Sequence, residues 1–403
     1  MQIQMVDLKG QYEKIKLEVD AAMAEVINNT QFIKGPQVKA FEDNLAAYLG
    51  VRNVIACANG TDALQIAMMA LDLKPGDEVI VPAFTYVATS EVIALLGLVP
   101  ILVDVDSETF CIDTHKIESK ISVRTKAIVP VHLFGQCANM EEVIGIANKH
   151  NLFVIEDTAQ AIGSRWKGMM NDELGIMKGE VSNNVSSNNL PSETTHHSSF
   201  IIHNSAAGSM GHIGTTSFFP SKNLGCYGDG GALMTNDDAL AKKIRMICNH
   251  GQSVQYVHEV IGVNSRLDSL QAAVLNVKLK YLKEYENARR QAAAWYDEEL
   301  GSIPGIVIPK RNVNSTHVFH QYTIQLEGID RDALRKYLAE KGIPSMVYYP
   351  MALHQQKAYE IYNVAKEGFP VSEMLCKRVL SLPMHTEMTQ EMVQEICAAI
   401  AAF

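Results

Sequence analysis

Lys222 lies in the stretch TSFFPSKNLGCYGDGG (216–231), which also holds two phenylalanines and four glycines. Glycine permits positive φ and a close approach of the backbone, so the stretch predicts a tight loop in which the backbone comes close to another group. A lysine amine becomes nucleophilic when burial and nearby positive charge lower its pKa. The pair Ser221–Lys222 alone would also fit a surface lysine beside a turn. Whether Lys222 is a reactive residue therefore depends on what other parts of the chain supply.

The stretch NGTDAL (59–64) predicts a site for a phosphate. A strand-like run ends before it, Gly60 permits a tight turn, and Thr61 and Asp62 begin a helical pattern. Free amides at a helix N-terminus bind anions, and the threonine hydroxyl adds a donor. An ordinary helix cap has the same pattern. Because the motif GxGxxG is absent, we do not expect this phosphate to belong to a dinucleotide.

The stretch VIEDTAQ (154–160) places a carboxylate at the end of an apolar strand, where α/β proteins bind ligands. Asp157 could keep a pyridine nitrogen protonated, which makes pyridoxal phosphate an electron sink. Gln160, three residues later, could donate a hydrogen bond to the phenolic oxygen of the same ring. Taken alone, Asp157 could equally cap the helix that follows.

Two weaker stretches complete the set. Tyr86 in PAFTYVAT could stack on a flat ring, although on its own it fits the core better. Asn264 and Arg266 in GVNSRLD precede a long helical pattern, where an arginine alone would suggest a surface ion pair. Together, a phosphate cup, a carboxylate, a stacking aromatic ring and a lysine in a glycine-rich loop are what a covalent link between lysine and pyridoxal phosphate requires.

Strand-like and helical patterns alternate along the chain around these residues. From residue 53 to residue 157, short β-rich runs alternate with helical patterns, which predicts an α/β fold with a mainly parallel sheet covered on both faces. One more strand (231–237) and a long helical pattern (265 to about 300) follow. We therefore predict a large domain over residues 1–280 and a smaller α/β domain over residues 281–403.

One segment, residues 169–210, interrupts this pattern. Its centre, 182–199, is dominated by Ser, Asn and Thr and has too little apolar surface to form a core, so we predict an exposed, mobile loop there. The adjacent pair His196–His197 could suggest a metal, but two histidines in a polar loop fit solvated side chains better, and we expect no metal.

The composition excludes several classes of partner. The 403 residues carry a formal net charge of −10 and no basic block, which argues against nucleic acid or an anionic membrane. Seven cysteines without a CxxC pair predict neither a disulfide framework nor a zinc site. Without a signal-peptide pattern or an apolar run of membrane-spanning length, a cytoplasmic protein is expected.

The five stretches around these residues resemble the DegT–StrS group of nucleotide-sugar aminotransferases. The resemblance runs from VDLKGQYEKIK near the start to FPVSEMLCKRVLSLPMH near the end, apart from residues 169–210. It implies the aspartate-aminotransferase-like fold of pyridoxal-phosphate enzymes of fold type I. In that fold, a mainly parallel seven-stranded sheet forms the large domain and a smaller α/β domain follows.

The resemblance also implies a role for each site residue. Lys222 would bond to the cofactor and move the proton during transamination, while Asp157 would pair with the pyridine nitrogen. Gln160 would meet the phenolic oxygen, and Tyr86 would stack on the ring. A homodimer with shared active sites is implied as well. The residues around the phosphate would be Gly60, Thr61, Asp62 and Ser217, with Asn264 reaching it from the second subunit.

The activity implied is transfer of an amino group, with glutamate as donor, to a keto group on a UDP-sugar for a surface polysaccharide or lipopolysaccharide O-antigen. The wording of CANGTDALQ and SFFPSKNLGCYGDGGA resembles most the branch acting on UDP-2-acetamido-2-deoxy-3-oxo-glucuronate. Arg266 would then bind the sugar carboxylate, because its planar fork matches two oxygens, and Tyr322 would be a second donor.

Three alternatives to a 3-keto sugar aminotransferase remain to be compared with the sequence. The acceptor could be a 4-keto nucleotide sugar. The related sugar dehydratases share the fold but carry histidine at the position of Lys222, which argues against that chemistry here. A regulator that binds the cofactor without catalysis would be expected to lose Lys222 or to gain a DNA-binding segment, and the sequence shows neither.

Overall fold

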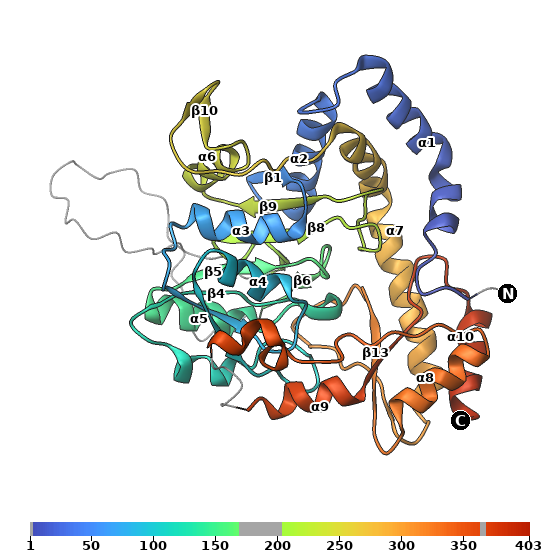
Figure 1. The fold of residues 1–403 in the computed structure, drawn as a ribbon. Coiled ribbons are helices and arrows are strands. Elements are labelled where there is room, and N and C mark those ends of the chain that lie inside the picture. The colour runs from blue at the N-terminus through green and yellow to red at the C-terminus, as the bar shows by residue number, and fades with distance from the viewer. Residues whose placement is uncertain (1–2, 169–203, 363–367) are drawn as a thin grey trace.

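The computed structural model describes residues 3–168, 204–362 and 368–403. Its centre is a seven-stranded sheet with the strand order β1-β9-β8-β5-β4-β2-β3 (Figure 1). All neighbours from β8 to β3 pair in parallel, whereas β9 runs antiparallel to both β8 and β1. The predicted mainly parallel seven-stranded sheet is therefore confirmed. Its strands are β1 (Asn53–Cys57), β2 (Glu78–Pro82), β3 (Val99–Val103), β4 (Thr125–Ile128), β5 (Phe153–Asp157), β8 (Ile213–Ser217) and β9 (Gly231–Thr235).

Helices cover both faces of this sheet, because its strands are apolar on both sides. Successive side chains of a strand point to opposite faces, and in β5 Ile155 packs into one core while Val154 packs into the other. The helices on the Ile155 face are α3 (Gly60–Ala70), α4 (Ala88–Leu95) and α6 (Asp238–Ile247), and those on the opposite face are α2 (Pro36–Leu49), α5 (Met140–His150) and the first half of α7 (Ser269–Leu300).

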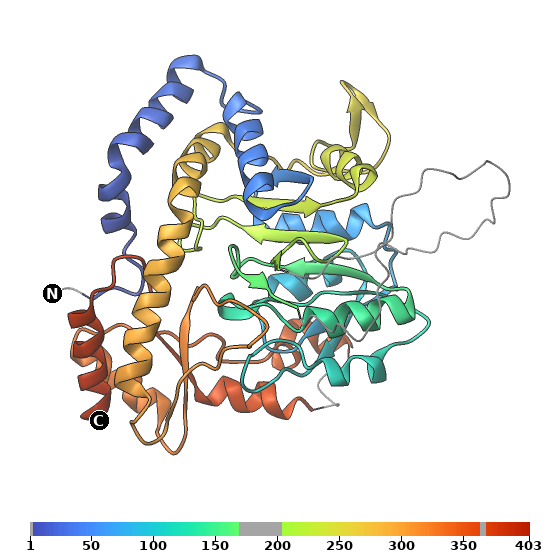
Figure 2. The ribbon, with the colours of Figure 1, turned by 180° about the vertical axis from the view of Figure 1, so that it is seen from behind.

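A second, three-stranded antiparallel sheet has the order β12-β13-β14 and its own core. Helix α7 joins the two cores: Leu275 packs beside the large sheet, and Tyr296 packs beside the small one (Figure 2). The predicted domain boundary at residue 280 falls inside this unbroken helix. The other elements here are β12 (Ile306–Val307), β13 (Tyr322–Leu326), α8 (Arg331–Glu340), α9 (Pro370–Arg378), β14 (Val379–Leu382) and α10 (Gln390–Ala401).

A long N-terminal helix and a β-hairpin lie outside these two sheets. Helix α1 (Leu8–Asn29) packs against α7, where Ile15 and Val19 contact the side chains of Val274 and Val277. A hairpin of β10 (Gln252–Val254) and β11 (Val257–His258) projects from the edge near α6 (Figure 1). Among the described residues, no helix has both the length and the apolarity to span a membrane.

Most of the predicted polar insertion, including its centre at 182–199 and the histidine pair, lies outside the described residues. Its last residues, 204–210, lie within the described part and are folded. Strand β7 (Ser205–Ala206) pairs with β6 (Arg165–Trp166), and Met210 is buried. The small residues AAGS that precede Met210 allow close packing, and Ala206, Ala207 and Gly208 are buried there.

Candidate active site

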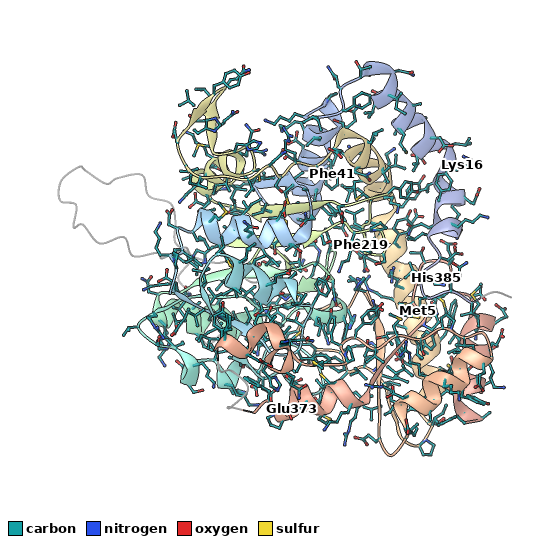
Figure 3. All side chains as sticks on the ribbon, viewed as in Figure 1. Met5, Lys16, Phe41, Phe219, Glu373 and His385 are labelled. Carbon is teal, nitrogen blue, oxygen red and sulfur yellow. The ribbon has the colours of Figure 1, made fainter. Side chains whose placement is uncertain are left out.

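A cavity of about 620 Å³ opens at the carboxyl ends of the central strands, between the two sheets. Parallel strands end at the same edge, so residues far apart in the sequence meet here. Phe219, labelled in Figure 3, lines the cavity with a half-exposed ring. Seven of the predicted site residues line it as well: Gly60, Thr61, Tyr86, Asp157, Gln160, Ser217 and Lys222.

Lys222 lies in a tight turn directly after β8. Its N–H donates to the carbonyl oxygen of Phe219 at 2.8 Å. Gly225 closes the turn, since a Cβ there would come within 2.3 Å of the Pro220 carbonyl oxygen. Although the side chain faces the cavity, surrounding protein atoms desolvate its ammonium group and lower its pKa to about 8, and the negative charge of Asp157 opposes this shift. At neutral pH a far larger fraction of this amine is neutral and nucleophilic than in an exposed lysine.

Asp157 ends β5 with a carboxylate held in one orientation. Its Oδ2 accepts a hydrogen bond from Thr89 Oγ1 at 2.8 Å, and its Oδ1 accepts one from the Ala159 N–H at 3.1 Å. A carboxylate fixed in this way suits a protonated ring nitrogen, because its position is set before the ring binds. Thr89, at the start of α4, was not predicted, since a threonine inside a helix gives no local signal.

The amide of Gln160 is oriented by two partners. Its Oε1 accepts from the Phe134 N–H at 2.8 Å, and its Nε2 donates to Tyr349 Oη at 3.0 Å. The second Nε2 hydrogen remains for a ligand in the cavity. Tyr349 also packs against Tyr86, with ring centroids 6.2 Å apart. No local pattern indicates Tyr349, because it follows α8, almost two hundred residues after Gln160.

Helix α3 supplies the anion-binding end of the cavity. Asn59 caps the helix by accepting from the Asp62 N–H at 2.8 Å, so the first amides of α3 lie beside Thr61 and Ser217. Gly60 is required at this point, since a Cβ there would lie 2.7 Å from the Ser217 Cβ. Asp62 belongs to the same turn but does not line the cavity. Helix amides and hydroxyl groups together form a phosphate site.

The residues fit pyridoxal phosphate as a set. A phosphate-binding helix end, a nucleophilic amine, an oriented carboxylate and an amide donor face one cavity, which matches the phosphate, the aldehyde, the ring nitrogen and the phenolic oxygen of that cofactor. The half-exposed ring of Tyr86 lies at the same cavity and offers an apolar face to a flat ligand.

His320 and Gln321, which precede β13, line the cavity without having been predicted. His320 is buried, and its Nδ1 lies 3.3 Å from the Oδ1 of Asn223, the residue after Lys222. Burial, with smaller effects of the Lys222 and Arg289 charges, lowers its pKa well below the ordinary value, so this imidazole is neutral. The stretch HVFHQYTI gave only a strand pattern, and its approach to Lys222 depends on packing between the two sheets.

Tyr322 does not contribute to the cavity, and its predicted contact with the sugar is wrong. The side chain is fully buried in the core of the small sheet, and its ring stacks on Tyr296 with centroids 4.6 Å apart. Its hydroxyl donates to Asp297 Oδ1 at 2.8 Å. Because side chains alternate along a strand, β13 directs Tyr322 into its core.

Asn264 and Arg266 also lie away from the cavity within one protomer. Asn264 is exposed, and Arg266 lines a separate recess of about 290 Å³ together with Lys34 and Arg245. Glu42, the acid in this recess, pairs with Arg245, and no salt bridge of the described residues includes Arg266, so the alternative of a surface ion pair is not seen. Their predicted roles across a dimer interface stay predictions.

A scan against protein-family models matches residues 13–401 to the DegT/DnrJ/EryC1/StrS aminotransferase family. Among curated proteins, the chain is 43% identical over 398 residues to UDP-2-acetamido-2-deoxy-3-oxo-D-glucuronate aminotransferase of Pseudomonas aeruginosa, covering 99% of both chains. It is 42% identical over 405 residues to a pleiotropic regulatory protein of Geobacillus stearothermophilus, covering 100% and 99%. It is 40% identical over 398 residues to UDP-N-acetyl-3-dehydro-alpha-D-glucosamine 3-aminotransferase of Acidithiobacillus ferrooxidans, covering 99% and 97%.

Solved structures agree with the fold. DesV from S. venezuelae, determined in complex with a ketimine intermediate, superposes with a TM-score of 0.88 at 33% identity and covers 100% of this chain and 98% of its own. NtdA from Bacillus subtilis with bound cofactor PMP gives a TM-score of 0.81 at 32% identity, covering 97% and 82%. The aspartate-aminotransferase-like fold expected from the sequence is thereby confirmed.

Proposed function

The chain belongs to the DegT/DnrJ/EryC1/StrS aminotransferase family, and on that premise we propose that it transfers an amino group from glutamate to the 3-keto carbon of a UDP-linked sugar. Family membership shows that the protein is a pyridoxal-phosphate-dependent nucleotide-sugar aminotransferase. The observation that carries the proposal is the meeting of Lys222 and Asp157 in one cavity that also receives the N-terminus of α3.

Each residue has a task in this proposal. When bound, pyridoxal phosphate stabilises the negative charge that develops as a substrate carbon loses its proton. The first amides of α3, with Thr61 and Ser217, hold the phosphate. Asp157 keeps a proton on the ring nitrogen. Lys222, with its pKa lowered to about 8, exchanges a proton between its amine and the reacting carbon near neutral pH.

The acceptor is proposed from similarity and from charge. Two relatives at 43% and 40% identity are named for 3-keto UDP-sugars, and they differ in whether the sugar carries a carboxylate. We favour the carboxylate-bearing UDP-2-acetamido-2-deoxy-3-oxo-glucuronate. In a homodimer, Asn264 would reach the phosphate and Arg266 the sugar carboxylate of the partner's cavity. No salt bridge within the described part of the protomer engages Arg266, which leaves its guanidinium available for such a contact.

We further place this reaction in the cytoplasm and its product in a surface polysaccharide, such as the O-antigen of lipopolysaccharide. The test of the reaction is a substrate screen. Purified protein with glutamate is offered 3-oxo and 4-oxo UDP-sugars, and the amino sugar formed is identified by mass spectrometry. Turnover of a 4-oxo sugar without turnover of any 3-oxo sugar would overturn the acceptor assignment.

The role of Arg266 has its own test. Losing one charge-assisted partner costs about 2 kcal/mol, so Arg266→Ala should lower kcat/KM for the uronate roughly thirtyfold. The matched substrate is a 3-oxo sugar whose C6 carries a neutral alcohol, for which the loss should be much smaller. An equal loss of kcat/KM on both substrates would show that Arg266 does not bind the sugar carboxylate.

A regulatory protein that binds the cofactor is the second candidate, since one relative is named a pleiotropic regulatory protein. Both candidates would bind pyridoxal phosphate, but only the enzyme needs the nucleophilic amine of Lys222. Conversion of the bound cofactor by glutamate in a single turnover, followed by its return on addition of a 3-oxo UDP-sugar, would favour the enzyme. No response to glutamate would favour the regulator.

A further inference from the structure

A buried carboxylate–imidazole pair lies behind the cavity, next to Asp157. The side chains of Glu156 and His132 are both 0% exposed, and Glu156 Oε2 lies 2.9 Å from His132 Nε2. Neither residue lines the cavity. Buried polar groups are costly unless every donor and acceptor is paired, so the partners of this pair show what it holds in place.

The hydrogen bonds fix where the proton of the pair resides. His132 Nδ1 accepts from the Ala138 N–H at 3.1 Å, so the ring proton is on Nε2 and is donated to Glu156. Glu156 also accepts from the N–H groups of Gly208, Met210 and Gly211, at 2.9, 2.6 and 2.6 Å. The carboxylate therefore serves four donors and is fully used as an acceptor.

These bonds join three segments of the chain. Glu156 fastens residues 208–211 to the end of β5. His132 closes the loop 132–138, because its ring bridges Glu156 at one end of the loop and the Ala138 amide at the other. The backbone N–H of His132 also donates to the Asp157 carbonyl oxygen at 3.0 Å, which ties the loop to the strand that carries the catalytic carboxylate.

The closed loop reaches the cavity through Phe134. This residue has a φ of 57°, in the left-handed region that non-glycine residues adopt only when their surroundings hold them there. In this conformation its N–H donates to Gln160 Oε1 at 2.8 Å. This bond fixes the oxygen end of the Gln160 amide, while Tyr349 Oη accepts from Nε2 at 3.0 Å, and together they leave one Nε2 hydrogen for the cavity. The loop has further supports on its other side, since Gly135 accepts from the Val318 N–H at 2.8 Å and the Cys137 N–H donates to Ser315 Oγ at 2.9 Å.

We propose that His132 and Glu156 are positioning residues, which hold the loop 132–138 in the shape that aims the Gln160 amide at the bound cofactor. The inference rests on the proposed contact between Gln160 and the phenolic oxygen. The two members of the pair are separable: Glu156 also anchors residues 208–211, whereas His132 does not contact them. A change at His132 therefore tests the positioning role without removing that anchor.

The measurement is the pH midpoint of the visible absorption band of the cofactor-loaded protein. A donor to the deprotonated phenolic oxygen lowers the proton affinity of the cofactor, so Gln160→Ala should raise the midpoint by about one pH unit. His132→Leu should raise it in the same direction by roughly half a unit or more and weaken cofactor binding several-fold. The double variant should shift no further than Gln160→Ala, because both changes remove one contact.

Thr323→Val is the control for a loss of stability alone. Thr323 Oγ1 and Ser381 Oγ form a buried pair 2.7 Å apart in the small sheet, away from the cavity. This variant should lower the melting temperature and leave the midpoint unchanged. If His132→Leu does not fold, His132→Asn, which keeps an acceptor for the Ala138 amide, should give a smaller shift in the same direction.

Two outcomes overturn the inference in distinguishable ways. If Gln160→Ala moves the midpoint but neither His132 variant does, the pair has only a structural role. If Gln160→Ala itself leaves the midpoint unchanged, the proposed contact of Gln160 fails, and the positioning role fails with it. In both cases the aminotransferase activity, measured separately with glutamate and a UDP-sugar, would still stand.

Discussion

The two walls of the cavity are built in different ways. The wall at the end of the seven-stranded sheet carries Lys222 and Asp157, each within a few residues of a strand end. The opposite wall carries His320 and Tyr349, which come from segments packed beside the small sheet. Residues of the first wall lie in short local motifs, whereas residues of the second reach the cavity only through contacts between distant parts of the chain.

The walls also differ in charge. Lys222 and Asp157 line the same cavity, and the negative charge of Asp157 raises the pKa of the Lys222 amine against the larger effect of burial. On the other wall, burial lowers the pKa of His320 and raises that of Tyr349, so both side chains are neutral near pH 7. We therefore expect the first wall to carry the chemistry and the second to contribute shape and hydrogen bonds.

The largest effect is expected at Lys222. Lys222→Ala should lower kcat by at least about a thousandfold, because the covalent link and the proton transfer are lost together. The purified protein should also lose its yellow colour. Borohydride reduction of the wild-type protein followed by peptide mapping should place a phosphopyridoxyl adduct on the peptide of Lys222.

Lys278 is the internal control for this mapping. It is also buried, its pKa is lowered by burial to about 8, and its Nζ lies 4.8 Å from the ring centroid of Tyr227. It does not line the cavity. An adduct on Lys278 would show that a low pKa and not position selects the lysine, and the assignment of the first wall would fail.

Asp157→Asn should have the next largest effect. Loss of the charged partner of the ring nitrogen should lower kcat by about 10- to 100-fold, as expected for a hydrogen bond to a charged group. Because the Asp157 charge raises the pKa of Lys222, the same change should lower that pKa below about 8. In cofactor-free protein the neutral amine attacks, so the rate of cofactor attachment should rise with pH at a lower midpoint in the variant. A midpoint that moves upward would contradict this account.

Tyr349→Phe probes the opposite wall and should have a smaller effect. It removes the acceptor of the Gln160 Nε2 hydrogen bond, which costs about 1 kcal/mol, or roughly fivefold in kcat/KM. Tyr296→Phe is the matched control, because it removes a buried hydroxyl that donates to the Pro383 carbonyl oxygen in the core of the small sheet, away from the cavity. A loss of activity at Tyr349 as large as that of Asp157→Asn would contradict the expectation that the first wall carries the chemistry and the second contributes shape and hydrogen bonds.

Tyr322→Phe should have the smallest effect on activity. Its hydroxyl donates to Asp297 in the core of the small sheet, so the variant should lose about 1 kcal/mol of folding stability and keep kcat/KM unchanged. Chemical denaturation and steady-state kinetics measure the two quantities. Reduced kcat/KM at unchanged stability would return Tyr322 to the active site.

The site residues that could be predicted from the sequence are those that lie in local motifs. Gly60, Thr61, Asp157, Ser217 and Lys222 were predicted because each lies where a strand ends, and parallel strands gather their ends at one edge. Tyr322 was wrongly predicted because HQYT shows which residues approach the small sheet but not which face of the strand each one occupies. The role of residues 204–210 was missed because small residues look like a loop until their packing partners are known.

Three features follow from the amino-acid sequence alone, since they depend on residues adjacent in the chain: the strand–helix order, the glycine-rich turn of Lys222 and the carboxylate of Asp157. Packing between distant segments, by contrast, brings His320 and Tyr349 to the cavity and Glu156 to His132 behind it. The physical reason is range: backbone preference and apolar periodicity act over a few residues, whereas a buried hydrogen bond is made wherever packing brings a donor to an acceptor.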